Sequence, residues 1–331
     1  ERNKMSSTED IRRHVPILLV LPNGILAEQT VRTYEEQINE SMLMGRLPGV
    51  TEAMVPALLD RLVRGISLQA GGRRGSGSQT VYVLERKGAL LFAGGGAAER
   101  DRVESILGAH GYPFKHARDM PGTRIEFDKA MISIVLNVGG LIHMVKPDGE
   151  LIDLRMGDLC KDSSKADFVS RITRAVFDVG KVAGAYPSDA RFDEVWAEHR
   201  ATIMSHAEHV TSSLKTFRDA LSDGLNSVKL FSNEEWILTP LSRYAANAGM
   251  YAEDALFLSL KKDVQAAMAR AMRYRDSGGD GKHSGAVSMN LTAQRNISLE
   301  LFEAGPENVV AVGTMLDNEH LIKLEVNVYL P

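Results

Sequence analysis

Hydrophobic positions in the first third of the chain predict alternating strands and helices. Residues 15–21 form a continuous apolar run of strand length, and turn residues follow at 22–24. We therefore expect a buried, parallel strand that ends in a loop. Apolar residues at helical spacing predict helices over 27–44, 52–62 and 97–109. Further strands are predicted over 62–70, 80–85 and 89–93.

From residue 123 onward the pattern becomes helical. Residues 164–184 are amphipathic, with Phe168, Ile172, Val176 and Val179 on one side. Further helices are predicted over 192–221, 234–248 and 254–274. A linker-like stretch at 277–285 precedes three predicted strands, over 297–302, 309–312 and 320–329. The predicted fold class is α/β followed by all-α, with domains at 1–122 and 123–276 and a linker with a small β extension at 277–331.

Lys129 is the most informative candidate for a functional residue. It lies in an otherwise apolar stretch, and a helix there should be buried. Burying an ammonium group is unfavourable unless the group is paired or faces a polar cavity. Ser133 and Asn137 follow at i+4 and i+8, so the three share one helix face with a drift of about 40° per step. Two interpretations remain open. The three residues line a polar cleft, or Lys129 lies near the start of the helix and its side chain reaches solvent past Glu126 and Asp128.

Two glycine-rich segments could bind a phosphate but are better explained otherwise. Residues 71–78 lie between two predicted strands, whereas a phosphate loop opens a helix, so we expect a long hairpin. Residues 94–96 join a strand to a helix. Glu99 and Asp101 in the first turn of that helix oppose a bound phosphate, which favours a plain turn.

Composition narrows the class of protein. A hydrophobic content of 44% with 25% charged residues is ordinary for a soluble globular chain, and 331 residues can form two domains. The net charge of −4, with no basic block, gives no reason to expect nucleic-acid binding. The single cysteine, Cys160, excludes an internal disulfide. His206 and His209 could face one metal from a predicted helix, but without a third ligand nearby we expect surface histidines and no metal.

The N-terminal residues, the hydropathy and the cysteine content indicate in which cellular compartment the protein is expected. Residues 1–4 are not an initiator sequence, so we expect a processed or partial product. The longest apolar runs are too short to span a bilayer. A reducing intracellular compartment fits the cysteine content. The mitochondrial matrix would suit a processed N-terminus, and the cytoplasm is the alternative.

Several elements, in order, resemble the ketopantoate reductase (2-dehydropantoate 2-reductase) family. Residues 19–24 resemble the family's "lxxQNG" element, with Asn23 at its asparagine. Residues 126–137 resemble the signature helix "WxKLxxNxxxN". Residues 209–214 resemble "xxxSSM", and 232–250 resemble "TEIDxxNGxxxxxAxxxGi". The resemblance covers roughly residues 10 to 265.

The resemblance implies a fold and an activity. The fold would be a partial Rossmann-like domain followed by a helical domain like that of 6-phosphogluconate dehydrogenase. The activity would be NADPH-dependent reduction of a 2-keto acid. Lys129 would be the general acid, Asn23 would lie near the nicotinamide, and Asn137 and Ser213 would hold the substrate. The family often dimerises through its helical domain, so a homodimer is one expectation.

The sequence also departs from the family pattern. The family opens with a strand, a G-x-G-x-x-G turn and a helix that together hold the pyrophosphate, and none of these precedes Asn23 here. Ser133 stands at the first asparagine after the lysine, and serine has a shorter reach. Asn233 aligns with the family's glutamate, although a one-residue slip would restore the carboxylate through Glu234. Thr239 replaces a glycine, and an insertion separates Ser213 from Asn233.

These departures predict a degenerate reductase-like protein, a non-catalytic structural or interaction subunit of a larger assembly that binds no cofactor by itself. The alternative is an active NADPH-dependent 2-keto acid reductase whose cofactor-binding half lies outside this sequence; NADP(H) would then be the cofactor. A third hypothesis is a binding module that keeps a cleft for a small acid. Other protein subunits are the expected partners, and the predicted strand at 321–329 could add to a partner's sheet.

Overall fold

The computed structural model describes most of the chain. The described residues are 6–21, 24–67, 70–74, 81–86, 89–111, 113–116, 120–278, 300–303 and 309–313. The chain divides into two compact units. Unit 1 comprises residues 1–125 and 295–331, and unit 2 comprises residues 126–294.

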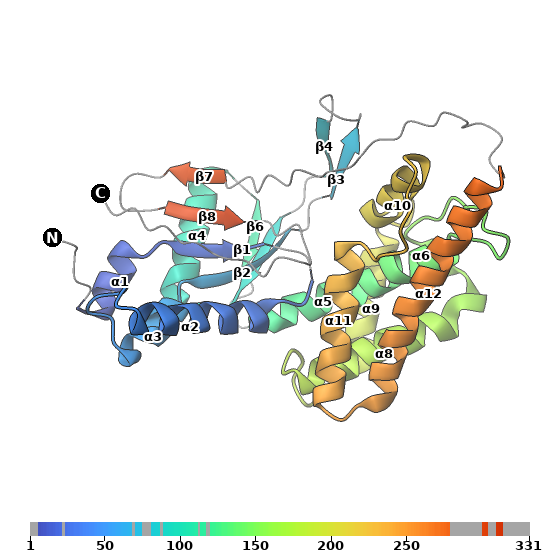
Figure 1. The fold of residues 1–331 in the computed structure, drawn as a ribbon. Coiled ribbons are helices and arrows are strands. Elements are labelled where there is room, and N and C mark those ends of the chain that lie inside the picture. Colours follow the sequence, from blue (N-terminus) through green and yellow to red (C-terminus); the bar gives the residue numbers. More distant parts are fainter. Residues whose placement is uncertain are drawn as a thin grey trace. The chain divides into compact units, whose positions relative to one another are not determined.

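Unit 1 contains a mixed sheet of six strands in the order β6-β5-β2-β1-β8-β7 (Figure 1). Its strands are β1 (Ile17–Val20), β2 (Leu62–Ser67), β5 (Leu90–Ala93), β6 (Phe114–His116), β7 (Glu300–Glu303) and β8 (Val309–Gly313). Its helices are α1 (Thr8–His14), α2 (Ala27–Leu43), the 3-10 turn η1 (Glu52–Met54), α3 (Val55–Leu59) and α4 (Ala97–Ala109). The predicted helix over 52–62 is thus a 3-10 turn followed by a short α-helix, because Pro56 at the start of α3 favours a new helical N-terminus there.

Strand β1 lies inside this sheet. It pairs in parallel with β2 on one side and with β8 on the other. Ile17 and Leu19 of β1 are 3% and 2% exposed and pack with Val63, Phe92 and Val103. The predicted buried, parallel strand is confirmed.

A separate two-stranded sheet holds β3 (Ala70–Arg74) and β4 (Val81–Arg86), which pair antiparallel. The first glycine-rich segment thus belongs to a hairpin, as predicted, but the expected bounds are wrong. The predicted strand over 62–70 ends at Ser67 and pairs with β1 and β5, and residues 71–74 of the expected loop belong to strand β3. Residues 75–80 lie outside the described residues. At the second segment, Arg100 Nη1 donates to the carbonyl oxygens of Gly94 and Gly95 at 3.1 and 2.7 Å. Glu99 is 3% exposed and pairs with Arg61 at 3.1 Å. Arg100 and Glu99, at the start of α4, thus bind groups of the protein itself, which agrees with the interpretation of residues 94–96 as a plain turn.

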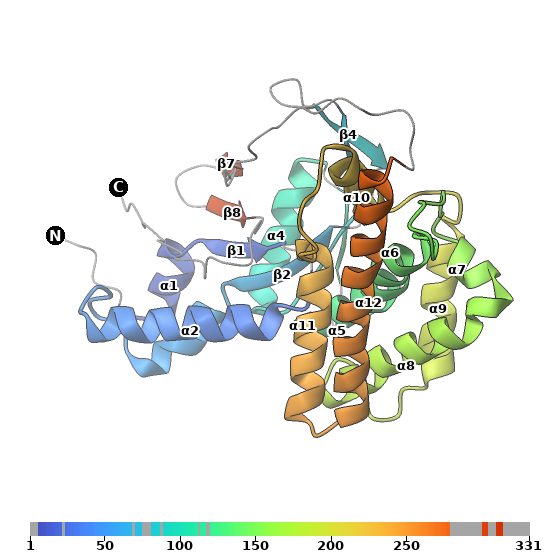
Figure 2. The ribbon, with the colours of Figure 1, turned by 45° about the vertical axis from the view of Figure 1, so that its right-hand side comes forward.

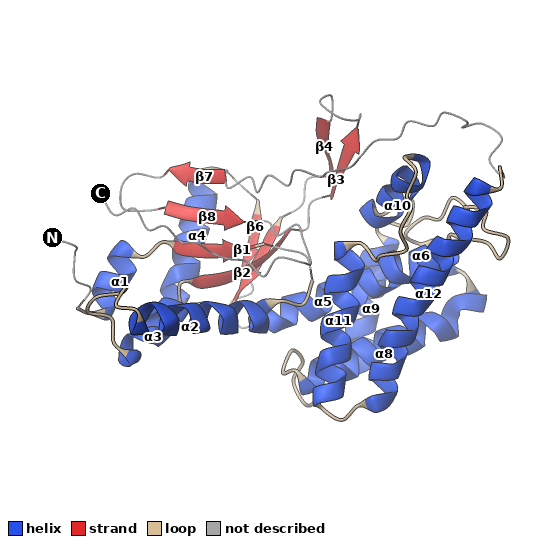
Figure 3. Ribbon diagram, viewed as in Figure 1, coloured by secondary structure: helices blue, strands red, loops and turns tan. Residues whose placement is uncertain are grey.

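Unit 2 is helical (Figure 3). Its elements are most of α5 (Gly122–Ser133), the π-helix η3 (Ile134–Gly139), α6 (Gly140–His143), α7 (Asp158–Lys161), the 3-10 turn η4 (Ser163–Lys165), α8 (Ala166–Val182), α9 (Phe192–Met204), α10 (Ser212–Ser222), α11 (Ser232–Asn247) and α12 (Tyr251–Asp276). Helices α11 and α12 run side by side (Figures 1 and 2). The division between the units falls within α5.

The helical region predicted over 192–221 forms two helices, with a break between them that was not predicted. Helix α9 ends at Met204, and α10 begins at Ser212 with Thr211 as its N-cap, whose hydroxyl accepts from the Leu214 amide at 3.2 Å. A threonine that caps the backbone competes with helix continuation. His206 and His209 consequently lie in the turn between the helices. Their rings are 5.8 Å apart, and no group of three metal-ligating side chains occurs among the described residues.

The predicted fold class, α/β followed by all-α, is confirmed. Strands β7 and β8 match the predicted strands at 297–302 and 309–312, whereas the predicted strand at 320–329 lies outside the described residues. The division into three domains stays a prediction; the described strands of the extension group with unit 1. None of the helices in the described part of the chain has the length and apolar character that a membrane span requires.

Candidate functional site

Lys129 lies on α5, among buried apolar side chains of unit 2. Its neighbours Phe127 and Met131 are fully buried, and Lys129 itself is half-buried. Glu126 is only 1% exposed, and Asp128 Oδ1 lies 3.1 Å from Nε2 of the 6%-exposed His199. Two acidic groups thus lie buried or half-buried next to Lys129 in sequence.

The helix changes its winding after Ser133. Residues Ile134–Gly139 form a π-helix, η3, which contains the half-buried Asn137. A π-helix winds more slowly than an α-helix, so a four-residue step falls short of a full turn instead of overshooting it. Asn137 is therefore turned back toward the helix face that carries Lys129. The prediction that the helix face drifts by the same angle at each four-residue step is wrong for the step from Ser133 to Asn137. Single π turns inside α-helices are frequent at functional sites.

Two glycines where the π-helix ends, Gly139 and Gly140, bring neighbouring helices close. A Cβ on Gly139 would lie 3.1 Å from Phe168 and 3.2 Å from Leu159. A Cβ on Gly140 would lie 3.1 Å from Leu214 of α10. Because Leu214 follows Ser213, the small residue at 140 lets the first turn of α10 pack against α6.

Ser213, Asn233 and Glu234 come together at the first turns of α10 and α11. Ser213 is 2% exposed, Glu234 is 0% exposed and Asn233 is half-buried. The amide Nδ2 of Asn233 donates to Oγ of Ser213 at 3.3 Å. Asn233 and Glu234, the two candidates for the family's acidic position, therefore both lie beside Ser213. Asn233 is hydrogen-bonded to it, and the Ser213 hydroxyl lies close enough to the buried Glu234 carboxyl to affect its pKa.

Burial dominates the electrostatics of Glu234. The N-terminus of α11 favours an anion, and the Ser213 hydroxyl and the backbone amide of Glu234 lower its pKa. Desolvation is the larger effect and raises the pKa of Glu234 from 4.5 to about 7. Neither carboxyl oxygen has a hydrogen bond of good geometry. At neutral pH a large fraction of Glu234 is thus a neutral carboxylic acid, which can donate as well as accept.

Chemically, this cluster offers a hydroxyl, an amide and a protonatable carboxyl within two helical turns. Such a set can hydrogen-bond a hydroxyl, a carbonyl or a carboxylate of a small molecule. Helix η3, which carries Asn137, packs against α11, which carries Asn233 and Glu234. Lys129, Ser133 and Asn137 follow one another along α5 and η3. The roles assigned to all of these residues stay predictions.

Asn23 lies outside the described residues. It belongs to the sequence of unit 1, whereas the other candidate residues belong to unit 2. A nicotinamide-contacting role for Asn23 also stays a prediction.

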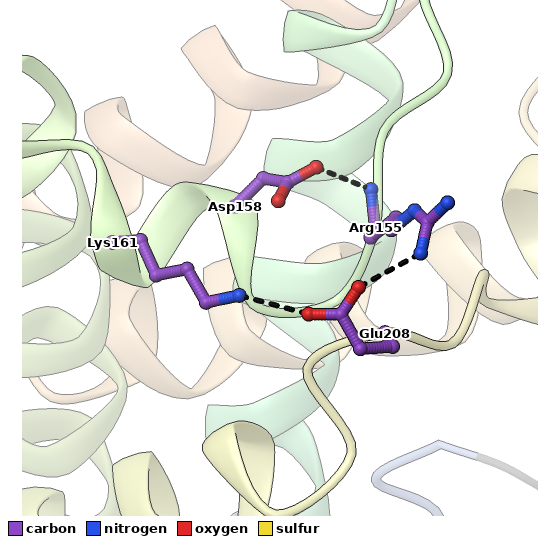
Figure 4. A network of polar contacts seen from close by, with 4 residues as sticks. All are labelled: Arg155, Asp158, Lys161 and Glu208. Atoms are coloured by element: carbon purple, nitrogen blue, oxygen red, sulfur yellow. Dashed lines mark hydrogen bonds and ion pairs between the residues drawn. The ribbon is translucent and has the colours of Figure 1, made fainter.

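A shallow depression on unit 2 contains none of the predicted residues. It is lined by His143, Ile152, Asp153, Leu154, Asp158, Leu159, Lys161, Asp162 and Lys165. Near it, the exposed Glu208 carboxylate bridges Arg155 Nη1 at 2.8 Å and Lys161 Nζ at 3.1 Å, and Asp158 accepts from the Arg155 amide at 2.7 Å (Figure 4). Burial, aided by nearby Lys165, lowers the pKa of His143. The mixed charges give this depression no preference for one sign of ligand.

No feature of the sequence indicates the Asp128–His199 contact. His199 follows no motif, and its partner is far away in the chain. Histidine and aspartate spacing within one helix cannot reveal a pair that joins α5 to α9. The burial of Glu126 was equally hidden, because its position at the start of an apolar helix is compatible with exposure.

No protein-family model and no curated protein sequence matches this chain. Solved structures do match. D-mandelate dehydrogenase, solved with NADH and anilino(oxo)acetate, is 16% identical and aligns over 81% of this chain and 89% of its own, with a TM-score of 0.51. The fold is shared with that dehydrogenase. A PanE/ApbA family ketopantoate reductase from Ralstonia eutropha JMP134 matches at 15% identity over 76% of this chain and 68% of its own, with a TM-score of 0.46. The 2-dehydropantoate 2-reductase from Methylococcus capsulatus matches at 16% identity over 78% and 66%, with a TM-score of 0.47.

Proposed function

We propose that this chain is a degenerate ketopantoate reductase-like protein that acts as a non-catalytic structural or interaction subunit. Support comes from the sheet of unit 1. In a Rossmann sheet of order 3-2-1-4-5-6, strand 4 pairs with strand 1, whose carboxyl end carries the glycine-rich turn that binds the pyrophosphate. We assign β1, which leads into the resembled element at residues 19–24, to strand 4 of that sheet, so the position next to it is where the dinucleotide turn belongs.

That position holds β8. Strand β8 pairs with β1 in parallel from Ile17 opposite Val310 to Val20 opposite Gly313. The residues after β8 are Thr314, Met315 and Leu316, so a single glycine replaces the G-x-G-x-x-G pattern. A sequence that lacks these glycines lacks the residues that let backbone amides approach a pyrophosphate closely. This occupied strand position is the observation that carries the proposal, and it is independent of where the sequence begins.

NADPH titration tests the proposal. Full-length protein should show no saturable change in intrinsic fluorescence, while D-mandelate dehydrogenase titrated with NADH serves as the positive control. Saturable binding of NADPH at micromolar concentration would refute the non-catalytic proposal.

One observation favours the alternative, an NADPH-dependent 2-keto acid reductase. The first turns of α10 and α11 still bring Ser213, Asn233 and Glu234 together in unit 2. If the protein reduces 2-dehydropantoate, Lys129→Ala should abolish NADPH consumption and leave the circular dichroism spectrum unchanged. Turnover that survives this substitution would remove Lys129 from the chemistry.

A further inference from the structure

The ends of the described chain meet in one sheet. Strand β8 lies beside β1, and the hairpin partner β7 lies outside β8 (Figure 1). Between α12 of unit 2 and β7, the sequence at 277–285 has the Gly/Ser-rich composition of a linker. The hairpin thus belongs to unit 1, although it follows the whole of unit 2 in the sequence.

Strand β1 depends on a neighbour at this edge. Ile17 and Leu19 are buried on β1, and β2 covers only one of its two hydrogen-bonding edges. If β8 leaves, β1 becomes an edge strand with unpaired backbone groups and apolar side chains at the core. Such an edge is a template for another strand.

The attachment of the hairpin is small. Four residues of β8 pair with β1, in the parallel arrangement, which is slightly weaker per residue than the antiparallel one. Among the residues that the structure describes, the main contacts of β8 are with β1 and β7. An element attached by so few main-chain hydrogen bonds can exchange with a competing strand, and a covalent tether raises its local concentration in that competition.

We propose that β7 and β8 are a detachable strand pair, and that the edge of β1 beside β8 is a strand-acceptor site that β8 occupies in cis. Release of the hairpin exposes the acceptor, and recapture closes it. The recognised ligand is an extended peptide that adds in parallel to β1 by main-chain hydrogen bonds. This acceptor edge rests on the proposed role as an interaction subunit, and it specifies the surface through which that subunit would bind a partner.

Cleavage between the hairpin and unit 2 tests the proposal in the full-length protein. A specific protease site is placed within 282–292, and the purified, folded chain is cut there. The C-terminal fragment should co-elute with the remainder. A fluorescently labelled peptide of residues 295–331 should then replace it, with saturation at one peptide per chain. Before cutting, the same peptide should bind at least tenfold more weakly.

A matched pair of variants shows whether β pairing holds the fragment. Ala311→Pro with Val312→Pro removes two consecutive N–H donors, one of which faces β1 and the other β7. In this variant the cut fragment should separate at once. Ala311→Val with Val312→Ile keeps both donors and should behave like the wild type.

Two results would overturn the inference. The wild-type fragment could separate as readily as the proline variant, which would show that β8 does not hold the edge. It could instead stay bound but never exchange with the labelled peptide, which would make the hairpin a permanent part of the sheet. Both results are independent of NADPH titration, so a failure here is distinguishable from a failure of the non-catalytic proposal.

Discussion

The Asn233 amide donates to the Ser213 hydroxyl at 3.3 Å and joins the first turn of α11 to the first turn of α10. The acceptor is 2% exposed. Because the bond is long, its net contribution should be at the lower end of about 0.5–1.5 kcal/mol. A double-mutant cycle with Ser213→Ala and Asn233→Ala, followed by urea unfolding, should give a coupling free energy of about 0.5–1 kcal/mol. Additive losses would show that the two residues contribute independently.

The stability of unit 2 should depend on the protonation of Glu234. Burial raises the pKa of its carboxyl from 4.5 to about 7. The folded state therefore binds more protons than the unfolded state between these two values. The stabilisation is fully present below pH 4.5 and is lost as the pH rises through about 7. The total change is on the order of 3 kcal/mol, since one pKa unit corresponds to about 1.4 kcal/mol.

Glu234→Gln isolates this effect. The amide is nearly isosteric and does not titrate, so the free energy of unfolding should vary less between pH 5 and pH 8 than in the wild type. Urea unfolding at four pH values measures it. Glu235→Gln, the half-buried neighbour in the same turn that pairs with Lys261 at 2.7 Å, is the control and should keep the wild-type pH dependence. An unchanged slope in Glu234→Gln would contradict the assignment.

How far the sequence predicts this molecule can be judged at particular residues. The apolar run around Ile17 and Leu19 predicts a buried parallel strand, because that pattern has few other solutions. The spacing of Lys129, Ser133 and Asn137 predicts that these three residues share one helix face. The π turn at Ile134–Gly139 was not predictable, because hydrophobic periodicity over six residues cannot separate π from α winding.

Contacts between residues far apart in the sequence could not be predicted, for a different reason. Ser213 and Asn233 are brought together by the packing of separate helices, and only the family resemblance linked them. The pairing of β8 with β1 joins opposite ends of the chain, and alternation within β8 predicts a strand but not its neighbour. The break at Thr211 was missed because the apolar spacing continues on both sides of the cap.

The Asp128–His199 contact should stabilise unit 2. The two atoms Oδ1 and Nε2 are 3.1 Å apart, and the His199 side chain is 8% exposed. His199→Ala leaves a half-buried Asp128 without this partner and removes packing, so we expect a loss of about 1–3 kcal/mol. His209→Ala, which changes an exposed histidine in the turn before α10, should change stability little. Thermal unfolding of both variants compares them; equal midpoints would show that the Asp128 contact is dispensable.

Two helical glycines should respond in opposite directions to the same substitution. A Cβ on Gly180 of α8 would lie 2.5 Å from the Tyr186 ring and 2.9 Å from the Phe127 ring, both of which are buried. Gly180→Ala should therefore overpack the core around α5 and destabilise by about 1–3 kcal/mol. A Cβ on Gly108 of α4 would meet only Phe114, at 3.8 Å, an ordinary contact. Gly108→Ala should stabilise by up to about 1 kcal/mol, since alanine loses less backbone entropy in a helix.

Phe127→Leu, combined with Gly180→Ala, sharpens the comparison. A smaller side chain at 127 gives the new methyl group room on one side, while Tyr186 still opposes it on the other. The double variant should lose less stability than the sum of the two single variants, with a coupling of about 0.5–3 kcal/mol. Urea unfolding of the three variants measures this coupling. If the losses add, Phe127 is not the group that excludes a side chain at 180, and the close approach of α8 to α5 has another cause.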